Sequence, residues 1–420
     1  MTRRTAVRVI GVGADGCASL SARALGAISS SQVLVGGERQ LAFFPEFGGE
    51  RVVLQNGIGA ALDLVERRAG EENVAILASG DPLFFGIGAT VVKRLGTEHV
   101  EVIPQPSAVQ WAFARVGLPW HDARLLSLHG RAREGFVTRL RRVSKVACFT
   151  DPEQSPPVLA RHMIEHGETR WRAWVCENLA AADERVRSFP LEELASIDDV
   201  GALNVLVLAR DEPGWWPPPL VPFVAEEAYA KRMPKLGLIT KREIRTLAIA
   251  ALELRADSVV WDVGAGSGSV AVEAAALAEQ GVVCAVEIDP EGAAICRENA
   301  RAHHVDNVRV IEGRAPEALA DLPDPDAVFV GGSKGSLDDI VGVALDRLRP
   351  GGRLVVNAIT LENVGEAYRV LRGRGLDPDV LMLNIARAVP LARYLRWESL
   401  NPVHLFAVTK PAPAAEVIPS

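Results

Sequence analysis

The sequence predicts an α/β protein of two domains, and three observations lead to this class. Apolar, β-branched segments alternate with helical segments along most of the 420 residues, which is the pattern of doubly wound sheets. Glycine-rich loops follow apolar segments at 9–16 and 259–269. Between them, segment 211–223 contains five prolines and a glycine, which forbid a helix and disfavour a central strand. Segment 211–223 is therefore the expected linker.

The first half contains two successive sets of expected strands. Helical segments such as 17–30 separate the strands of the first set, which are 6–13, 32–37, 73–80 and 100–105. A second set follows Trp111 and predicts a second lobe packed on the first. Its strands are expected at 123–130, 145–150, 172–179 and 202–209.

The second half is expected to form one parallel sheet with an antiparallel edge. A helix within 239–254 places Ile244, Leu247, Ala248, Ala251 and Leu252 on one face, and Thr240 with Glu243 forms a capping box. Segments 379–389 and 401–410 follow one another without a long helix, which predicts an antiparallel pair. The parallel strands are expected at 258–263, 282–287, 308–311, 327–330 and 353–357.

Composition limits the classes of partner. The chain is 48% hydrophobic and 24% charged, with a net charge of -7, so it lacks the basic surplus expected of a nucleic-acid-binding protein. No apolar run is long enough to span a bilayer, and the start of the chain lacks a signal-peptide pattern. The five cysteines are odd in number, never in a CxxC pair, and expected to be reduced and mostly buried in a cytoplasmic protein; they are Cys17, Cys148, Cys176, Cys284 and Cys296.

The glycine loop of the second half favours a nucleoside ligand without pyrophosphate. Gly264, Gly266 and Gly268 follow Asp262 as G-x-G-x-G, and the place of the third glycine in a dinucleotide fingerprint is taken by a serine. S-adenosylmethionine is such a ligand. Glu287 ends the next expected strand, where a carboxylate accepts hydrogen bonds from ribose hydroxyls.

The loop of the first half supports a competing interpretation. Gly11, Gly13 and Gly16 satisfy G-x-G-x-x-G, and Glu38 lies about 20 residues on, as in NAD-binding proteins. A dehydrogenase needs neither the G-D-P turn at 80–82 nor the serine that opens a helix at 107. Two alternatives stay open from the residues alone: a two-domain NAD-dependent oxidoreductase and a non-catalytic nucleotide-sensing protein.

The order of the motifs adds a family resemblance. In residues 1–210, "GVG", "SGDP", "PSA" and "SLHGR" resemble the tetrapyrrole methylase family, and "SLHGR" its branch acting on cobalamin precursors. In residues 224–410, "ITKREIR", "DVGAGSGS", "AVEIDPE", "FVGGSKG" and "NAITLEN" resemble its partner, a Rossmann-like class I methyltransferase. The fusion, joined by linker 211–223, is similar to the family of precorrin-6Y C(5,15)-methyltransferases (decarboxylating).

This resemblance implies a two-lobed tetrapyrrole methylase fold followed by a doubly wound domain with an antiparallel edge hairpin. It implies one S-adenosylmethionine per domain and methylation of precorrin-6B at ring carbons 5 and 15. Carbon dioxide leaves the ring C acetate, and the product is precorrin-8 of cobalamin biosynthesis. The C-terminal domain would act on carbon 15 and decarboxylate, the N-terminal domain on carbon 5. A homo-oligomer is expected, because relatives of both domains assemble.

The same resemblance implies a set of cofactor contacts. Two departures from the family pattern are Ala14 and Asp15 in the first loop, and Arg314 where related enzymes often carry an aspartate. The contacts expected in the first half are Gly80, Asp81, Ser107 and Ala108, and those in the second half are Thr240, Gly264, Ala265, Gly266, Ser267, Gly268, Glu287 and Ala315.

Peripheral carboxylates of a tetrapyrrole call for cationic partners. Arg131, Lys334 and Thr360 are the expected substrate contacts, while His129 and Asn357 are weak catalytic candidates. We expect no metal site, on the ground that the eight histidines form no ligand-spaced cluster. Further cationic candidates, each of which taken singly is better explained as a solvated surface charge, are Arg133, Arg387, Arg393 and Arg396.

Overall fold

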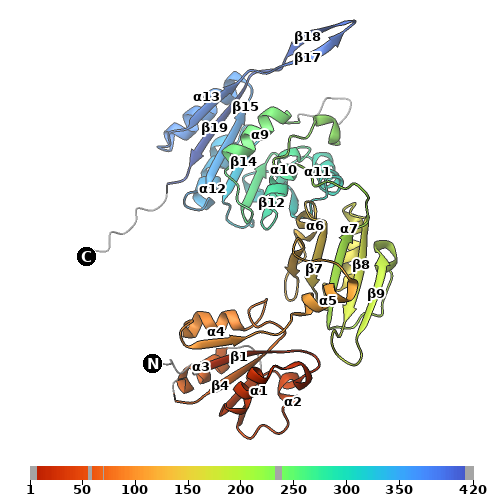
Figure 1. Cartoon of the computed structure of the whole chain (residues 1–420). Helices are drawn as coiled ribbons and strands as arrows, with labels where there is room; N and C mark the ends of the chain where they lie inside the picture. The colour runs from red at the N-terminus through yellow and green to blue at the C-terminus, as the bar shows by residue number, and fades with distance from the viewer. Residues whose placement is uncertain (1–6, 55–58, 70, 232–238, 412–420) are drawn as a thin grey trace, which may run out of the picture. The chain divides into compact units, whose positions relative to one another are not determined.

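The computed structural model describes residues 7–54, 59–69, 71–231 and 239–411, in two compact units (Figure 1). The first unit comprises Met1–Ala132, Ser144–Arg161 and Arg170–Pro213. The second unit comprises Arg133–Val143, His162–Thr169 and Gly214–Ser420. The longest segment of the second unit thus begins within the expected linker. The unit also includes two short segments from the first half of the chain.

The first unit opens with a five-stranded parallel sheet of order β3-β2-β4-β1-β5. One core layer joins Ile10, Leu34 and Leu77 to α1 and α2, and the opposite layer joins alternate residues such as Val9 to α3. A short 3-10 turn, η1 (Cys17–Ser19), occupies the expected start of α1. The elements are β1 (Val7–Val12), α1 (Ala22–Ser29), β2 (Val33–Gly36), α2 (Glu38–Ala42), β3 (Glu50–Val53), α3 (Gly59–Arg68), β4 (Val74–Ser79), α4 (Gly88–Leu95) and β5 (Val100–Ile103).

A second sheet forms the other lobe of the first unit, as predicted. Its order is β6-β7-β10-β8-β9, and only β6 and β7 run parallel. Val109, Ala112 and Phe113 of α5 pack against its core. β3 and β9 were not predicted, because charged residues interrupt their apolar pattern. The elements are α5 (Ala108–Val116), β6 (Arg124–Ser127), β7 (Lys145–Phe149), β8 (Trp171–Glu177), β9 (Arg185–Pro190), α8 (Leu191–Leu194) and β10 (Asn204–Arg210).

The second unit contains a doubly wound sheet of order β13-β12-β11-β14-β15-β19-β16. Residues of α9, α10 and α11 pack on one face, and those of α12 and α13 on the other. The five predicted parallel strands are confirmed to within a residue at each end. The elements are α6 (Phe136–Leu140), η2 (Glu226–Ala228), α9 (Arg242–Ala251), β11 (Val259–Val263), α10 (Ser269–Leu277), β12 (Val282–Glu287), α11 (Pro290–Ala302), β13 (Val308–Glu312), η3 (Glu317–Leu319), β14 (Ala327–Val330), α12 (Leu337–Arg347), β15 (Arg353–Ala358) and α13 (Leu361–Gly373).

The antiparallel edge is confirmed, although its connection differs from the prediction. β16 (Asp379–Leu383) pairs with β19 (Val403–Thr409), which pairs with β15. The expected single strand 379–389 is interrupted, because 386–391 leaves the sheet as β17 (Ala386–Leu391). β17 forms a separate hairpin with β18 (Tyr394–Ser399), which projects from this unit (Figure 1).

The start of α9 differs from the predicted capping box. Lys241 is the N-cap residue, and its side chain makes no capping hydrogen bond. Thr240 lies one residue before the N-cap position, and Glu243 binds Arg387 instead. Leu247, expected on the buried face, is 40% exposed, whereas Arg245 is fully buried. Arg245 Nε lies 2.7 Å from the carboxylate of Glu273, which compensates its burial.

Three smaller expectations can be compared with the structure. Four of the five cysteines are buried and Cys17 is exposed, and none of the five forms a disulfide. From the sequence we also expect Trp215 and Trp216 to hold the linker against a domain surface; Trp215 is half-buried, but Trp216 is 85% exposed, so the expectation fails for Trp216. Within the described residues, the helices are too short or too polar to cross a membrane.

Candidate functional site

The main pocket of the second unit lies at the carboxyl ends of its parallel strands. Residues that follow β11, β12, β13, β14 and β15 all line a cavity of about 710 Å³. This edge is where open α/β sheets bind ligands, and the volume falls in the range of about 300–1,000 Å³ usual for small-molecule sites. Expected contacts on its lining are Thr240, Gly264, Ala265, Gly266, Ser267, Glu287, Ala315, Lys334 and Asn357.

The glycine loop is shaped by close backbone contacts. Gly264 has a φ of +73°, and a Cβ there would lie 2.5 Å from the carbonyl oxygen of Gly332. The amides of Gly264 and Ala265 both donate to the carbonyl of Val286, at 2.9 and 3.1 Å. The loop therefore stays close to the sheet edge, where no larger residue fits at 264.

Glu287 supports this loop and also lines the cavity. Its Oε2 accepts from the amide of Gly266 at 2.7 Å, and its Oε1 accepts from the amide of Asp289 at 2.9 Å. The side chain is buried. Asn299, which the sequence analysis missed, donates to the carbonyl of Ser267 at 2.8 Å. Only the folded chain brings α11 to the loop, so no local signal identified Asn299.

Two buried polar groups of the lining lack partners within the described residues. Both carboxylate oxygens of Asp262 and the amide oxygen of Asn357 have no hydrogen-bond partner there. Burial raises the pKa of Asp262 to about 7. Because buried polar groups in proteins are nearly always hydrogen-bonded, these atoms fit a ligand that donates hydrogen bonds. A nucleoside with an ammonium group and hydroxyls, such as S-adenosylmethionine, has those donors.

Cationic side chains on the lining give part of the cavity a positive charge, and only some of these side chains were predicted from the sequence. Lys334 was expected there, and it adopts a φ of +45°. Arg314, noted as a departure from the family pattern, also lines the cavity. Lys231 and Lys241 were missed, because single lysines carry no pattern.

Other predicted contacts of the second half lie elsewhere. Gly268 is the N-cap of α10 and contacts Cys296, and Thr360 accepts from the amide of Asn363 as the N-cap of α13. Neither lines the cavity. Arg387, one of the cationic candidates, binds Glu226 and Glu243 at 2.8 and 2.5 Å.

The remaining two arginines of that group lie on the projecting hairpin. Arg396 pairs with Glu398 at 2.9 Å, and Arg393 donates to the hydroxyl of Tyr394. Both arginines therefore have partners within the hairpin, and neither lines the cavity.

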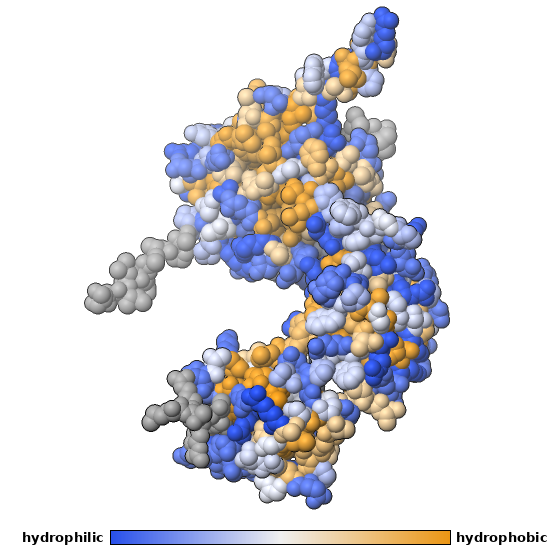
Figure 2. All heavy atoms as spheres, viewed as in Figure 1, coloured by the Kyte–Doolittle hydropathy of each residue, from blue (hydrophilic) through white to orange (hydrophobic). Residues whose placement is uncertain are grey.

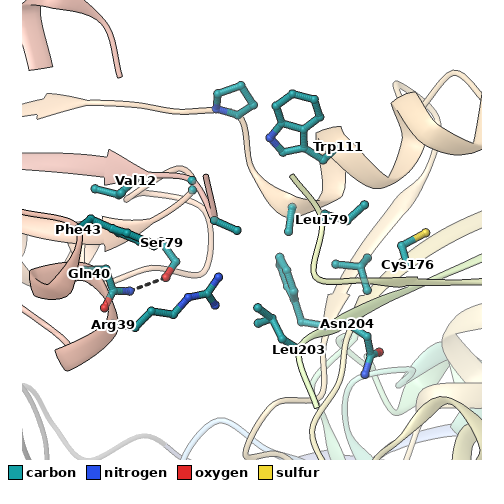
Figure 3. Close-up of a pocket in the computed structure, with 17 residues that line it drawn as sticks. Val12, Arg39, Gln40, Phe43, Ser79, Trp111, Cys176, Leu179, Leu203 and Asn204 are labelled. Atoms are coloured by element: carbon teal, nitrogen blue, oxygen red, sulfur yellow. Dashed lines mark hydrogen bonds between the residues drawn. The ribbon is translucent and has the colours of Figure 1, made fainter. Parts of the chain in front are cut away.

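A second pocket, of about 120 Å³, lies within the first unit (Figure 3). Residues of the first lobe, such as Val12 and Ser79, face residues of the second lobe, such as Leu179 and Asn204 (Figure 3). Gln40 donates to the hydroxyl of Ser79 at 2.8 Å. Of the expected contacts, Gly80 and Ala108 line this pocket, whereas Asp81 and Ser107 do not.

The motifs around this pocket have identifiable backbone roles. A Cβ at Gly11 would lie 2.0 Å from the carbonyl oxygen of Gly80, so strands β1 and β4 end in close contact. Asp81 accepts from the amide of Leu83 at 2.9 Å. Ser107 and Gln110 form a complete capping box at the start of α5. The N-cap interpretation of Ser107 is therefore confirmed.

The N-terminal glycine loop does not have dinucleotide geometry. In the dinucleotide fold the third glycine opens the helix that receives pyrophosphate. Here Gly16 is followed by η1, and α1 begins only at Ala22 with Ser21 as its N-cap. β4 also lies between β1 and β2 in the sheet. Gly11, Gly13 and Gly16 match the motif, but each lies where an added Cβ would come too close to a neighbouring residue.

The histidine and arginine candidates of the first half lie outside the pocket lining. His129 and Arg131 are exposed, and the amide of Gly130 between them donates to Asp151 at 2.7 Å. Arg133 is also exposed. The statement that no histidines have ligand spacing was wrong: His162 and His166 lie one helical turn apart and cluster with Glu165.

Comparison with known families agrees with the two expected parts of the chain. A family described as "Tetrapyrrole (Corrin/Porphyrin) Methylases" matches residues 6–195. A family described as "Precorrin methyltransferase domain" matches residues 233–410. Together the two matched regions cover most of the chain and are separated by the proline-rich segment.

Curated relatives match both the whole chain and its parts. A protein of Sinorhizobium sp., named precorrin-6Y C(5,15)-methyltransferase [decarboxylating], is 34% identical over 406 residues, 96% of both chains. A cobalt-precorrin-7 C(5)-methyltransferase of Salmonella typhimurium is 38% identical over 47% of this chain and 97% of its own. A probable cobalt-precorrin-6B C(15)-methyltransferase (decarboxylating) of Methanothermobacter thermautotrophicus is 41% identical over 40% of this chain and 86% of its own.

Proposed function

Because this chain belongs to the family of precorrin-6Y C(5,15)-methyltransferases (decarboxylating), we propose that it methylates precorrin-6B at ring carbons 5 and 15. The ring C acetate is decarboxylated, and the product is precorrin-8 of cobalamin biosynthesis. The observation that carries this proposal is the 34% identity over 96% of both chains. The oxidoreductase alternative has no support among the relatives and lacks the helix geometry that a dinucleotide needs.

We propose one S-adenosylmethionine site in each unit. In the second unit, Glu287 receives the ribose hydroxyls and the backbone at 264–267 surrounds the nucleoside, with Thr240 and Ala315 on the same lining. In the first unit, Gly80 and Ala108 contact the cofactor, while Asp81 and Ser107 shape the loops beside it. The unpartnered oxygens of Asp262 and Asn357 support the site in the second unit most directly.

When bound, S-adenosylmethionine would supply a methyl group to an electron-rich carbon of the ring. The chain then has to position the two reactants, since positioning alone supplies much of the rate in such displacements. Asp262 and Glu287 place negative charge on one wall of the cavity, and three lysines with Arg314 place positive charge on its lining. This polarity suits a cationic cofactor beside a substrate that carries several carboxylates.

We propose that the same cations hold the acetate and propionate groups of the substrate. Lys334 follows β14 and Asn357 ends β15, so both lie where the acceptor must approach the glycine loop. Lys334→Gln should raise KM for the tetrapyrrole at least tenfold and leave the cofactor Kd unchanged. An unchanged KM would remove Lys334 from the substrate site.

The chemistry is tested by one incubation of the full chain with precorrin-6B and S-adenosylmethionine. Mass spectrometry should show a product with two methyl groups gained and one carbon dioxide lost. Labelled methyl groups and carbon NMR then locate both additions. An unchanged substrate, in protein that binds the cofactor, would contradict the proposed substrate.

We propose further that the chain forms a homo-oligomer in a reducing, cytoplasmic compartment. The absence of disulfides among the five cysteines supports the compartment. Exposed apolar side chains on the edge strand β16 and on the hairpin support the assembly. Figure 2 shows hydrophobic residues on the visible face of the second unit. Leu395→Asp should convert the oligomer to a smaller species in light scattering. The exposed residues concerned are Val380, Leu381, Met382, Leu391, Tyr394, Leu395 and Trp397.

A further inference from the structure

A cluster of metal-ligand type lies at the end of α7 (Pro156–Glu165), away from both pockets. His162, Glu165 and His166 each offer one ligand atom, and these atoms all lie within 4.8 Å of one another. The two rings lie with centroids 4.5 Å apart. Residues three and four apart share one face of a helix, so the spacing brings the side chains together.

The hydrogen bonds of the two rings fix which nitrogens remain available. His162 Nε2 lies 2.8 Å from Asp306 Oδ2. Asp306 also accepts hydrogen bonds from the amides of Val137 and Thr138, at 3.0 and 2.9 Å. An ionised carboxylate only accepts, so Nε2 of His162 donates and its Nδ1 keeps a lone pair.

His166 is oriented in the same manner. Its Nδ1 lies 2.9 Å from the backbone carbonyl of His162, which only accepts, so Nδ1 carries the proton and Nε2 keeps a lone pair. Histidines that bind metals almost always donate their other nitrogen to a carboxylate or a carbonyl. Both forms of that support are present here.

We propose that His162 Nδ1, His166 Nε2 and the carboxylate of Glu165 bind one divalent transition-metal ion, with water completing the coordination. Two imidazoles and a carboxylate suit zinc and its neighbours in the series. Ligand atoms around zinc lie roughly 3.4 Å apart, and the exposed side chain of Glu165 can rotate to reach that separation. The bound ion would stabilise the end of α7 and its contact with Asp306.

The test uses the full chain without a polyhistidine tag, with Cys17→Ser to remove the exposed thiol, after treatment with a chelator. Titration calorimetry with Zn²⁺ should show one ion per chain, and Co²⁺ should give a visible ligand-field spectrum. Glu165→Gln and His166→Gln should each weaken Zn²⁺ binding at least tenfold. The matched control is His99→Gln, because His99 also lies beside a glutamate, Glu98, at 3.6 Å, but is solvent-exposed.

Thermal unfolding provides a second measurement, which does not depend on the calorimetric signal. Saturating Zn²⁺ should raise the Tm of the parent and of His99→Gln, and should leave the Tm of Glu165→Gln and His166→Gln unchanged. Circular dichroism establishes that both variants are folded. Absence of stoichiometric binding, or equal affinity in the parent and both cluster variants, would overturn the proposal.

Discussion

Glu287 shows how one side chain can hold a loop and receive a ligand. Both of its oxygens already accept backbone amides, from Gly266 and Asp289, and each oxygen can accept a second hydrogen bond. The carboxylate is therefore fixed in position before a ligand arrives. Charge-assisted hydrogen bonds of this kind contribute more than neutral ones.

Glu287→Gln should weaken S-adenosylmethionine binding to the second unit by about 1–3 kcal/mol, because an amide replaces a carboxylate that accepts charged and neutral donors. Equilibrium binding measures the loss. The control is Glu312→Gln, since Glu312 ends the neighbouring strand in register with Glu287 but lies outside the cavity lining. Equal affinities in the parent and Glu287→Gln would place the ribose elsewhere.

Asp262 is the residue at which pH should act on ligand binding. Burial raises its pKa to about 7, against about 3.9 in an unfolded chain. Between these values the folded state holds a proton that the unfolded state has released, so this group lowers stability as pH rises from about 4 to about 7. A cationic ligand prefers the ionised carboxylate and therefore favours loss of that proton.

The affinity of the second unit for S-adenosylmethionine should accordingly rise roughly tenfold between pH 6 and pH 8. Asp262→Asn should bind more weakly and lose this pH dependence. Asp257→Asn serves as the control, because Asp257 is 71% exposed and precedes the same strand. A wild-type pH profile in Asp262→Asn would show that another group titrates.

The glycine loop and α10 illustrate how two elements constrain one position. Gly268 has a φ of +74°, and a Cβ there would lie 2.2 Å from the sulfur of Cys296 on α11. Position 268 therefore requires glycine because α10 packs against α11. Gly264, by contrast, is restricted by the backbone of Gly332 on the cavity side.

Gly268→Ala should lower the free energy of unfolding by about 2–5 kcal/mol, from left-handed strain together with overpacking. Chemical denaturation measures the change. Gly365→Ala is the matched control: Gly365 lies within α13 with nothing within 4 Å of an added Cβ, so alanine should be neutral or stabilising. A stable Gly268→Ala that fails to bind cofactor would assign this glycine to the ligand.

At the scale of the whole molecule, the boundary between the two compact units does not coincide with the proline-rich linker alone. Segment 211–223 contains no helix or strand, yet 133–143 and 162–169 belong to the second unit. Val137, Thr138 and His162 supply hydrogen bonds to Asp306 in that unit. A cobalt-precorrin-7 C(5)-methyltransferase and a probable cobalt-precorrin-6B C(15)-methyltransferase (decarboxylating) each resemble one part of this chain.

Cutting the chain within 217–219 should give two halves that fold and bind S-adenosylmethionine separately. The C-terminal half should have a lower Tm than in the whole chain, because Asp306 loses its partners. With precorrin-6B it should add one methyl group and release one carbon dioxide, and the N-terminal half should then methylate carbon 5. Decarboxylation by the N-terminal half would reverse this assignment of chemistry.

The sequence by itself determined the class of the fold and the position of its parallel strands, because hydrophobic periodicity and glycine turns are local signals. It also placed Glu287 and Gly264 at strand ends, where parallel topology brings them to one edge. The predicted capping box at Thr240 did not form. α9 starts one residue later than predicted, and Glu243 binds Arg387, a partner 144 residues away.

Only the tertiary structure decided which polar and charged groups meet. Arg245 is buried against Glu273, Asn299 reaches the glycine loop, and Lys241 joins Lys334 on one lining. Each of these contacts joins different elements of the second unit. Pairing of buried charges depends on distances across the folded core, which no local pattern encodes, whereas strand periodicity depends only on which face of each segment is buried.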